Sequence, residues 1–459
     1  MAEMTAAVLH GKEDLRVGRV PVPVAGAGEV VLRVGAALTC GTDLKVYRRG
    51  YHAAMGKPPM LFGHEVAGVV EQVGGDVTQW KKGDRVVALN SAPCDACFFC
   101  RNGQQNLCED LRMERVPVPR AAQGELVLRV GAALTCGTDL KVYRRGYHAM
   151  MLKPPIPFGH ELAGEVVETG PGVTNFHIGD RVVPLNSAPC DLCFWCRQGQ
   201  QNLCEDLLFN NGAYAEYMRI PARIVEKNTL LVPDGVPLEH AALTEPLACV
   251  VRGLEESGAR PGDTMVVIGA GPIGLMFMHA AQLNGVHVIA VIKREDQRPL
   301  AQAFGARSIV CLEDSEDVIG DVRKLTPDAR GADVVIEAVA TPKTWEWAVA
   351  MARRGGVVNF FGGPPSGTVV SLDTNRIHYG EITLKASFHH TPATARTALD
   401  LVTSGRFKCS EYITGTARLE DLPKVFARMV KRGSVAANGA HSGLNGDIKT
   451  AVHPTGSLQ

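Results

Sequence analysis

The sequence has no excess of charge of either sign. Its 459 residues include 48 lysines and arginines and 48 aspartates and glutamates, so the formal net charge is zero. The two signs are mixed along the chain, and no basic block stands out. Because a basic patch is what attracts nucleic acids and anionic membranes, we expect neither as a partner.

Long apolar runs are missing as well. No stretch reaches the roughly 18 residues of a membrane-spanning helix, and the longest candidate, 265–281, is interrupted by three glycines and a proline. The first fifteen residues lack the basic start and apolar core of a secretory signal. The sequence therefore predicts a cytoplasmic protein without a membrane partner.

Cysteine is sparse outside two clusters. Ten of the 13 cysteines fall in two sets with regular spacing, and only Cys249, Cys311 and Cys409 are scattered. A secreted disulfide framework does not have this distribution. The clustering of the cysteines instead favours reduced thiolates that hold metal ions.

A tandem duplication dominates what is present. Residues 19–111 recur without a gap as residues 115–207, with most positions identical. The triplet Glu-Asp-Leu at 13–15, 109–111 and 205–207 marks the seams. Removing one 96-residue unit leaves 363 residues, a natural size for a two-domain enzyme.

Each copy contains a cysteine cluster with the spacing C-x2-C-x2-C-x7-C. Four thiolates at this spacing can form a closed tetrahedral shell, for which zinc is the usual ion. Such a site stabilises a loop, because it leaves no open coordination position. The predicted ligands are Cys94, Cys97, Cys100 and Cys108 in the first copy, and Cys190, Cys193, Cys196 and Cys204 in the second.

Each copy also carries a second set of ligand types. A cysteine opens a Cys-Gly-Thr-Asp run, and a Gly-His-Glu motif follows it. A thiolate, an imidazole and a carboxylate supply three ligands and leave one position open, which is typical of a catalytic zinc. The predicted ligands are Cys40, His64 and Glu65 in the first copy, and Cys136, His160 and Glu161 in the second.

A glycine-rich turn follows the duplicated region. The β-branched run 264–268 leads into it, and a helical stretch, 275–284, comes after it. This order lets backbone N–H groups approach a pyrophosphate at the start of a helix. Further strands are expected at 287–292, 308–312, 333–338, 356–361 and 382–388, which predicts a doubly wound parallel sheet. The predicted cofactor-binding residues of the turn are Gly269, Gly271, Pro272, Ile273 and Gly274.

The choice between NAD and NADP depends on the end of the second strand. An acidic residue there would bind the ribose 2′-hydroxyl of NAD, but this chain has Lys293 and Arg294. Our hypothesis is that these two cations bind the 2′-phosphate of NADP. The alternative is a solvated charged turn in which Glu295 or Asp296 reaches the ribose of NAD.

Several motifs together carry a family resemblance. They are Gly-His-Glu-x-x-Gly at 63–68 and 159–164, the four-cysteine loops, Gly-Asp-Arg-Val at 83–86 and 179–182, and Thr-Glu-Pro-Leu-Ala at 244–248. The chain resembles the zinc-containing medium-chain alcohol dehydrogenases, within the branch of sorbitol (L-iditol) and threonine dehydrogenases. With one repeat set aside, the resemblance covers nearly the whole chain.

The resemblance implies roles for further residues. Thr138 would be the first proton acceptor beside the catalytic zinc, with Thr42 in that role in the first copy. Glu245, which occurs only once, would lie at the zinc site or act as an alternative ligand. Many relatives have a histidine where this chain has Lys45 and Lys141. Proton exit would then run through water, or the lysine would bind an anionic substrate or the cofactor phosphates.

The expected fold is α/β plus β. A GroES-like β-barrel catalytic domain, duplicated as 1–111 and 112–249, precedes a Rossmann domain at 250–390. Residues 391–459 return to the catalytic domain, with a helix at 419–432, a flexible insert at 433–444 and a final strand at 448–452. One Rossmann domain can face only one catalytic cleft. We favour the second copy for that cleft because Glu245 is continuous with it, and assembly around the first copy is the alternative.

The predicted function is reversible oxidation of a secondary alcohol or polyol, with zinc and NAD(P) as cofactors. L-threonine or a sugar phosphate is the alternative substrate within the same family. A non-catalytic zinc- and nucleotide-binding protein, disabled by the duplication, is the rival from another class. The resemblance also implies a dimer or tetramer, if the extra copy permits one. The Phe388-His389-His390 segment is interpreted as packing at a strand end or a dimer contact.

Overall fold

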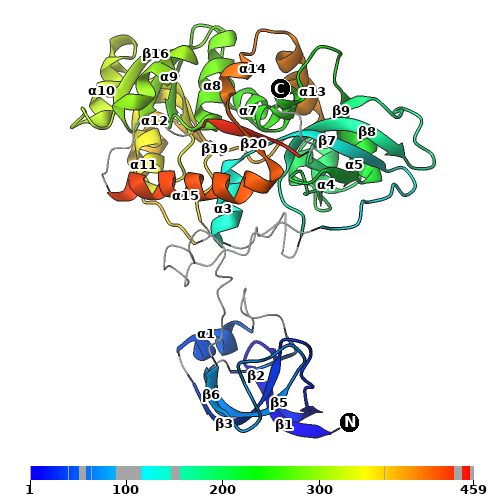
Figure 1. Cartoon of the computed structure of the whole chain (residues 1–459). Coiled ribbons are helices and arrows are strands. Elements are labelled where there is room, and N and C mark those ends of the chain that lie inside the picture. Colours follow the sequence, from blue (N-terminus) through cyan, green and yellow to red (C-terminus); the bar gives the residue numbers. More distant parts are fainter. Residues whose placement is uncertain are drawn as a thin grey trace. The chain divides into compact units, whose positions relative to one another are not determined.

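The fold comes from a computed structural model that describes residues 2–39, 41–50, 58–63, 65–88, 115–145, 156–365, 367–438 and 447–454. The side chains at 41, 42, 49, 144, 145 and 431–438 are not described. The chain divides into two compact units, Met1–Cys108 and Glu109–Gln459. Each unit is treated by itself below (Figure 1).

The first unit consists of two small antiparallel sheets and a helix. One sheet has the order β2-β1-β4, formed by β1 (Glu3–Gly11), β2 (Asp14–Pro21) and β4 (Met60–Leu61). The other has the order β3-β5-β6, formed by β3 (Val30–Leu38), β5 (Glu65–Val73) and β6 (Arg85–Ala88). Helix α1 spans Gly41–Arg49. Among its described residues, only Leu9, Val46 and Val70 are buried hydrophobic side chains.

The second unit begins with the second copy, folded as a seven-stranded sheet. The order is β13-β9-β8-β7-β21-β20, and β12 also pairs with β7. The repeat supplies β7 (Leu126–Leu134), β8 (Glu161–Thr169) and β9 (Arg181–Pro184). Later segments supply β12 (Tyr217–Ile220), β13 (Thr229–Leu231), β20 (Ile413–Arg418) and β21 (Lys449–His453). The sheet is thus completed by strands from outside the repeat.

Short elements complete this part of the second unit. Strands β10 (Ser187–Ala188) and β11 (Leu208–Phe209) form a two-stranded sheet. The helices are α3 (Gly137–Arg145), α4 (Phe194–Arg197), α5 (Ala222–Asn228), α6 (Leu238–Ala242) and α7 (Thr244–Ser257).

The predicted Rossmann sheet is confirmed. Six parallel strands have the order β16-β15-β14-β17-β18-β19, the arrangement of a doubly wound dinucleotide fold. They are β14 (Thr264–Ile268), β15 (His287–Ile292), β16 (Ala306–Cys311), β17 (Ala332–Glu337), β18 (Ala352–Phe360) and β19 (Thr383–Ala386). Each face of the sheet carries a buried apolar cluster.

Helices cover both faces of this sheet (Figure 1). They are α8 (Pro272–Leu283), α9 (Arg298–Ala303), α10 (Val318–Lys324), α11 (Pro342–Met351) and α12 (Thr374–Gly380), together with α7, which packs on β18. Helix α13 (Pro392–Thr403) packs against α7. Helix α14 (Cys409–Tyr412) precedes β20.

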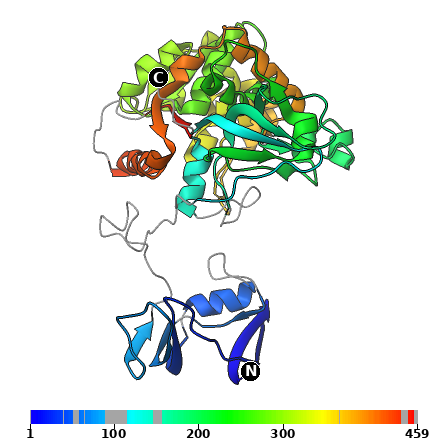
Figure 2. The same ribbon diagram turned by 45° about the vertical axis from the view of Figure 1, so that its right-hand side comes forward.

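The last helix differs from the sequence prediction. Helix α15 spans Leu422–Asn438, so the predicted end at Arg432 and the flexible insert from 433 were wrong as far as residue 438. A single glycine at 433 costs a helix only about 1 kcal/mol, and the residues after it tolerate helical geometry. Residues 439–446 lie outside the described residues. Helix α15 lies beside α3, where the rings of Tyr143 and Phe426 are 5.0 Å apart (Figure 2).

Candidate functional site

Three ligand types of the second copy converge at one end of β7 and β8. The two strands are antiparallel, with Leu134 opposite Glu161, so the residues after β7 lie next to those that open β8. Ligand atoms of Cys136, His160 and Glu161 all lie within 4.8 Å of one another. His160 and Glu161 are buried. The pairing of β7 with β8 therefore brings Cys136 and His160 together, although they lie 24 residues apart in the sequence.

The His160 ring is held in one orientation. Its Nδ1 donates to Asp139 Oδ1 at 2.9 Å, and the hydroxyl of Tyr214 donates to the other oxygen of Asp139 at 2.7 Å. Burial alone would lower the pKa of His160, but the charges of Asp139 and Cys136 raise it well above its usual value. With Nδ1 occupied, Nε2 is the ring nitrogen left for a metal, as in many histidine–zinc sites.

Glu161 has one satisfied oxygen and one unsatisfied oxygen. Lys449 Nζ, from β21, donates to Glu161 Oε2 at 2.5 Å and to the carbonyl of Thr135 at 3.1 Å. Both side chains are fully buried, and Glu161 Oε1 has no hydrogen-bond partner among the described residues. A buried carboxylate oxygen without a donor costs free energy unless a cation binds it. The donor set therefore fits a metal ion.

Two residues beside this set come from the next helix. The backbone N–H of Thr138 donates to Cys136 Sγ at 3.4 Å, which places Thr138 at the start of α3 next to the cluster. Lys141, one turn further along, donates from Nζ to the carbonyl of Gly363 at 3.3 Å. Lys141 thus links the second copy to the Rossmann domain.

Glu245 lies in the first turn of α7 with two histidines nearby. Its Oε1 is 3.9 Å from His390 Nε2, and that nitrogen lies 2.9 Å from Asn186 Oδ1. Ligand atoms of Glu245, His389 and His390 lie within 4.8 Å of one another. Burial raises the pKa of Glu245 to about 7. The two histidines therefore lie beside Glu245, and their interpretation as packing at a strand end or a dimer contact stays a prediction.

The four-cysteine loop of the second copy closes on itself without disulfides. The ligand atoms of Cys190, Cys193, Cys196 and Cys204 lie within 4.8 Å of one another, and all four thiols are free. Backbone N–H groups of Leu192 and Cys193 donate to Cys190 Sγ. Backbone donors lower the pKa of Cys193 to about 6. Burial raises the pKa of Cys196 to about 12 and also raises that of Cys204, so it is the convergence of four free thiols at this spacing that fits a structural zinc ion.

The glycine turn has the geometry of a nucleotide-binding loop. Gly269 has φ +105°, and a Cβ at Gly274 would lie 1.9 Å from the Gly269 carbonyl oxygen, so neither position admits a side chain. A Cβ at Gly271 would meet nothing within 4 Å, so the backbone there is open to a ligand. Helix α8 begins at Pro272, with Ile273 in its first turn. The turn therefore fits a pyrophosphate at a helix N-terminus.

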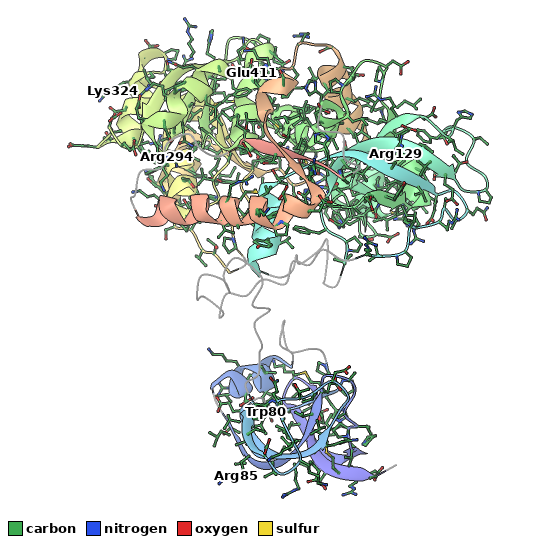
Figure 3. The ribbon with its side chains drawn as sticks, in the orientation of Figure 1. Trp80, Arg85, Arg129, Arg294, Lys324 and Glu411 are labelled. Atoms are coloured by element: carbon green, nitrogen blue, oxygen red, sulfur yellow. The ribbon has the colours of Figure 1, made fainter. Side chains whose placement is uncertain are left out.

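Lys293 and Arg294 follow β15 as the sequence places them. Both backbone N–H groups donate to Gln297 Oε1, which fixes the turn. Arg294 pairs with Asp296 at 3.1 Å, and Glu295 pairs with Arg298. Each acidic side chain of this turn therefore already has an arginine partner. Figure 3 marks Arg294 on the Rossmann domain.

Only Glu65 among the first copy's candidate ligands lies within the described residues. Cys40, His64, Cys94, Cys97, Cys100 and Cys108 lie outside the described residues, as does the side chain of Thr42. Glu65 opens β5 opposite Leu38, the pairing that Glu161 and Leu134 make in the second copy. The two copies therefore share this strand register.

Two protein-family models match the sequence of the chain. The "Alcohol dehydrogenase GroES-like domain" matches twice, at residues 26–117 and 122–234, and "Zinc-binding dehydrogenase" matches at 272–404. Together these profiles span more than half of the chain.

The chain belongs to the zinc-binding alcohol dehydrogenase family.

Similar proteins agree with this family. The sorbitol dehydrogenase of Bacillus subtilis (strain 168) is 30% identical over 329 residues, covering 70% of this chain and 91% of that protein. The L-threonine 3-dehydrogenase of Pyrococcus abyssi is 36% identical over 268 residues, covering 57% and 74%. A crystal structure of a Sinorhizobium meliloti 1021 protein bound to NADP has a TM-score of 0.66 and 29% identity, covering 74% and 95%.

As a member of the zinc-binding alcohol dehydrogenases, the chain is an oxidoreductase that uses zinc and NAD or NADP. The predicted GroES-like and Rossmann folds are confirmed, and the double match agrees with the duplication. No helix in the described ranges is long and apolar enough to cross a membrane. Sequence reasoning missed Tyr214, Asn186 and Lys449, and it quoted Asp139 without a role.

Proposed function

We propose that the enzyme oxidises a secondary alcohol or polyol reversibly, with the second copy as its working active site. The observation that carries this proposal is the buried set of Cys136, His160 and Glu161, with Glu161 Oε1 lacking a partner. A zinc ion bound there would supply a Lewis acid that lowers the pKa of an alcohol. The names of the relatives support the substrate class, since sorbitol and L-threonine both carry a secondary alcohol.

The chain's own residues would position the substrate and move its proton. We assign Thr138 as the first proton acceptor, because it lies beside Cys136 at the start of α3. Glu245, with a pKa raised to about 7, can gain or lose a proton near neutral pH. Asp139 and Tyr214 hold His160 in place. Cys190, Cys193, Cys196 and Cys204 would hold the structural zinc.

We assign the cofactor to the turn formed by Gly269, Gly271, Pro272, Ile273 and Gly274, with a preference for NADP. Lys293 and Arg294 support this preference, because β15 ends without an acidic residue and Glu295 is paired with Arg298. The ratio of kcat/KM for NADP and NAD tests it. A ratio near one, or a clear preference for NAD, would contradict it.

The oligomer and the compartment are also proposed. We propose a homo-oligomer, supported by β19, which pairs with only one strand among the described residues and so offers a free edge. A cytoplasmic location is supported by eight free thiols in the described chain. Light scattering on the purified chain and fractionation of the source cells test these two proposals.

The activity is tested by following NAD(P)H formation at 340 nm on the full chain. The panel contains sorbitol, other polyols, simple secondary alcohols and L-threonine, each with and without prior zinc chelation. We expect turnover that chelation abolishes and that added zinc restores. L-threonine as the best substrate would favour the alternative within the family. A folded, zinc-loaded protein that turns over no substrate would favour the non-catalytic rival.

A further inference from the structure

Five arginine side chains gather at the amino ends of β17 and β18. Arg323 comes from the end of α10, Arg330 from the turn before β17, and Arg376 from α12. Arg353 and Arg354 come from the start of β18. Together they line a cavity of about 550 Å³. Helices α10, α11 and α12 lie around this end of the second unit (Figure 1).

This cavity is separate from the cofactor turn. The turn at Gly269 follows the carboxyl end of β14, whereas the arginines lie where β17 and β18 begin. Strands β14, β17 and β18 are parallel, so the cofactor turn lies at the carboxyl ends of the strands and the arginines lie at their amino ends. Strand β17 has six residues, and at roughly 3.3 Å per residue it spans about 20 Å.

The carboxylates near the cavity do not balance the arginines. Asp333 accepts from Arg353 Nε at 2.6 Å and from the backbone N–H of Thr264 at 2.8 Å. Asp373, in the cavity lining, accepts from the backbone N–H of Arg376 and so caps α12. These two carboxylates face five guanidinium groups, which leaves an excess of positive charge.

Two of the arginines are anchored by neutral groups. Arg376 donates to the carbonyls of Val349 and Ala350, and Arg323 donates to the carbonyl of Arg330. A carbonyl fixes a guanidinium in place without cancelling its charge. Burial and the nearby charge of Arg323 lower the pKa of Arg376, consistent with cations that lack enough counter-charge.

Arg353 is paired with Asp333, and the remaining two arginines have side chains available for a ligand. Arg330 and Arg354 are exposed, and neither guanidinium makes a hydrogen bond or a close ion pair within the described chain, although the charge of Arg330 contributes to lowering the pKa of Asp333. The anchored arginines thus supply a fixed positive field, and these two supply ten unused N–H donors between them. Tyr379, 74% exposed, and Ile382 add apolar surface to the lining.

We propose that this cavity binds a small molecule that carries a pyrophosphate group, with Arg330 and Arg354 as its direct contacts. Guanidinium groups bind phosphate oxygens in a bidentate fork, and arginine clusters are how proteins recognise such anions. A single phosphate carries about −1.5 to −2 charges at pH 7, so two linked phosphates balance the excess better. The volume lies within the usual range of small-molecule sites.

Calorimetric titration of the full chain with inorganic pyrophosphate tests the proposal. One equivalent of NADPH per chain is added first, so that it fills the cofactor turn and leaves no excess of its own pyrophosphate group for the arginine cavity. We expect one pyrophosphate per chain, and binding at least tenfold weaker in the double variant R330Q/R354Q. The double variant R396Q/R406Q is the matched control, because it removes the same charge from exposed sites outside the cavity. Its affinity should stay within twofold of the parent.

The melting temperature is a second readout, which distinguishes loss of the binding site from a folding defect. Pyrophosphate should raise the melting temperature of the parent and of R396Q/R406Q by a few degrees, and should leave that of R330Q/R354Q unchanged. Without ligand, all three proteins should melt at similar temperatures, because the only hydrogen bond that the replaced side chains make in the described chain is an exposed one from Arg406 to the carbonyl of Leu283 at 3.4 Å. Absence of binding, or equal affinity in both double variants, would overturn the proposal. Since it makes no use of the alcohol site, it can fail or succeed independently of the dehydrogenase function.

Discussion

Strands β3 and β7 have the same sequence after their first residue, yet one is exposed and the other buried. Val34 is 58% exposed and Leu38 67%, whereas Val130 and Leu134, at the same places in the second copy, are 0% exposed. Val87 and Val183 differ in the same way, at 74% and 0%. Trp80, labelled in Figure 3, is 44% exposed where Phe176 is buried. The sequence of a repeat copy therefore does not by itself determine whether its side chains are buried.

The partners outside the repeat make the difference. In the second copy, β12 and β21 pair with one edge of β7, and α6 packs on β7 and β8. In the first unit, the described strand β3 pairs only with β5. Burying one Val or Leu side chain stabilises a fold by about 1.5–3 kcal/mol. One set of partner strands exists for two copies, so only one copy can be completed.

The largest effect should come from Cys136 and Cys40, the proposed cysteine ligands of a catalytic zinc in the two copies. Cys136→Ser removes a proposed zinc ligand of the completed copy, and we expect kcat/KM to fall by more than about 100-fold, the upper range for changes outside the ligand shell. Cys40→Ser is the matched control in the first copy and should stay within twofold. Turnover at 340 nm and zinc content per chain measure both. The opposite result would make the first copy the working site.

Leucines at equivalent places in the two copies should show the same asymmetry in stability. Leu134→Ala opens a cavity in the completed sheet, and we expect the free energy of unfolding of the second unit to fall by about 2–5 kcal/mol. Leu38→Ala changes an exposed side chain and should shift stability by less than about 0.5 kcal/mol. Calorimetry of the full chain gives both values. Equal losses would mean that the first copy buries β3 against a partner in solution.

The next largest effect should come from Asp139 and Asp43, which lie three residues after Cys136 and Cys40. Asp139→Asn weakens the hydrogen bond that orients His160, and such changes cost about 10- to 100-fold in metal affinity or activity. Asp43→Asn is the same change in the first copy and should leave both unchanged. Zinc competition with a chromophoric chelator reports the affinity. Comparable weakening of one zinc by each variant would show that both copies hold a catalytic-type zinc.

The sequence could predict the parts whose signals are local. The strand, glycine turn and helix at 264–284 lie next to one another in the chain, so periodicity and the Gly269–Gly274 pattern sufficed. The cysteine spacing likewise gives the 190–204 loop. The end of α15 was missed because a glycine is only a weak barrier to a helix.

The residues that complete the site have no local signal. Lys449 lies 288 positions from Glu161, and Tyr214 lies 75 positions from Asp139. A lone lysine near the end of a chain is usually a solvated surface residue, and only the pairing of β21 with β7 buries this one. The same long-range pairing completes the sheet of the second copy, and for that reason the composition of two similar repeats could not rank them.

The smallest effect should come from the lysines at equivalent places in the two copies. Lys141 donates to the carbonyl of Gly363 and so joins the second copy to the Rossmann domain, whereas Lys45 lies in the other unit. An exposed hydrogen bond of this kind contributes about 0.5–1.5 kcal/mol, so Lys141→Met should raise KM for the cofactor about two- to tenfold with little change in kcat. Lys45→Met should change neither. A fall in kcat without a change in KM would instead mean that Lys141 takes part in proton transfer, because the loss would then appear only in the transition state.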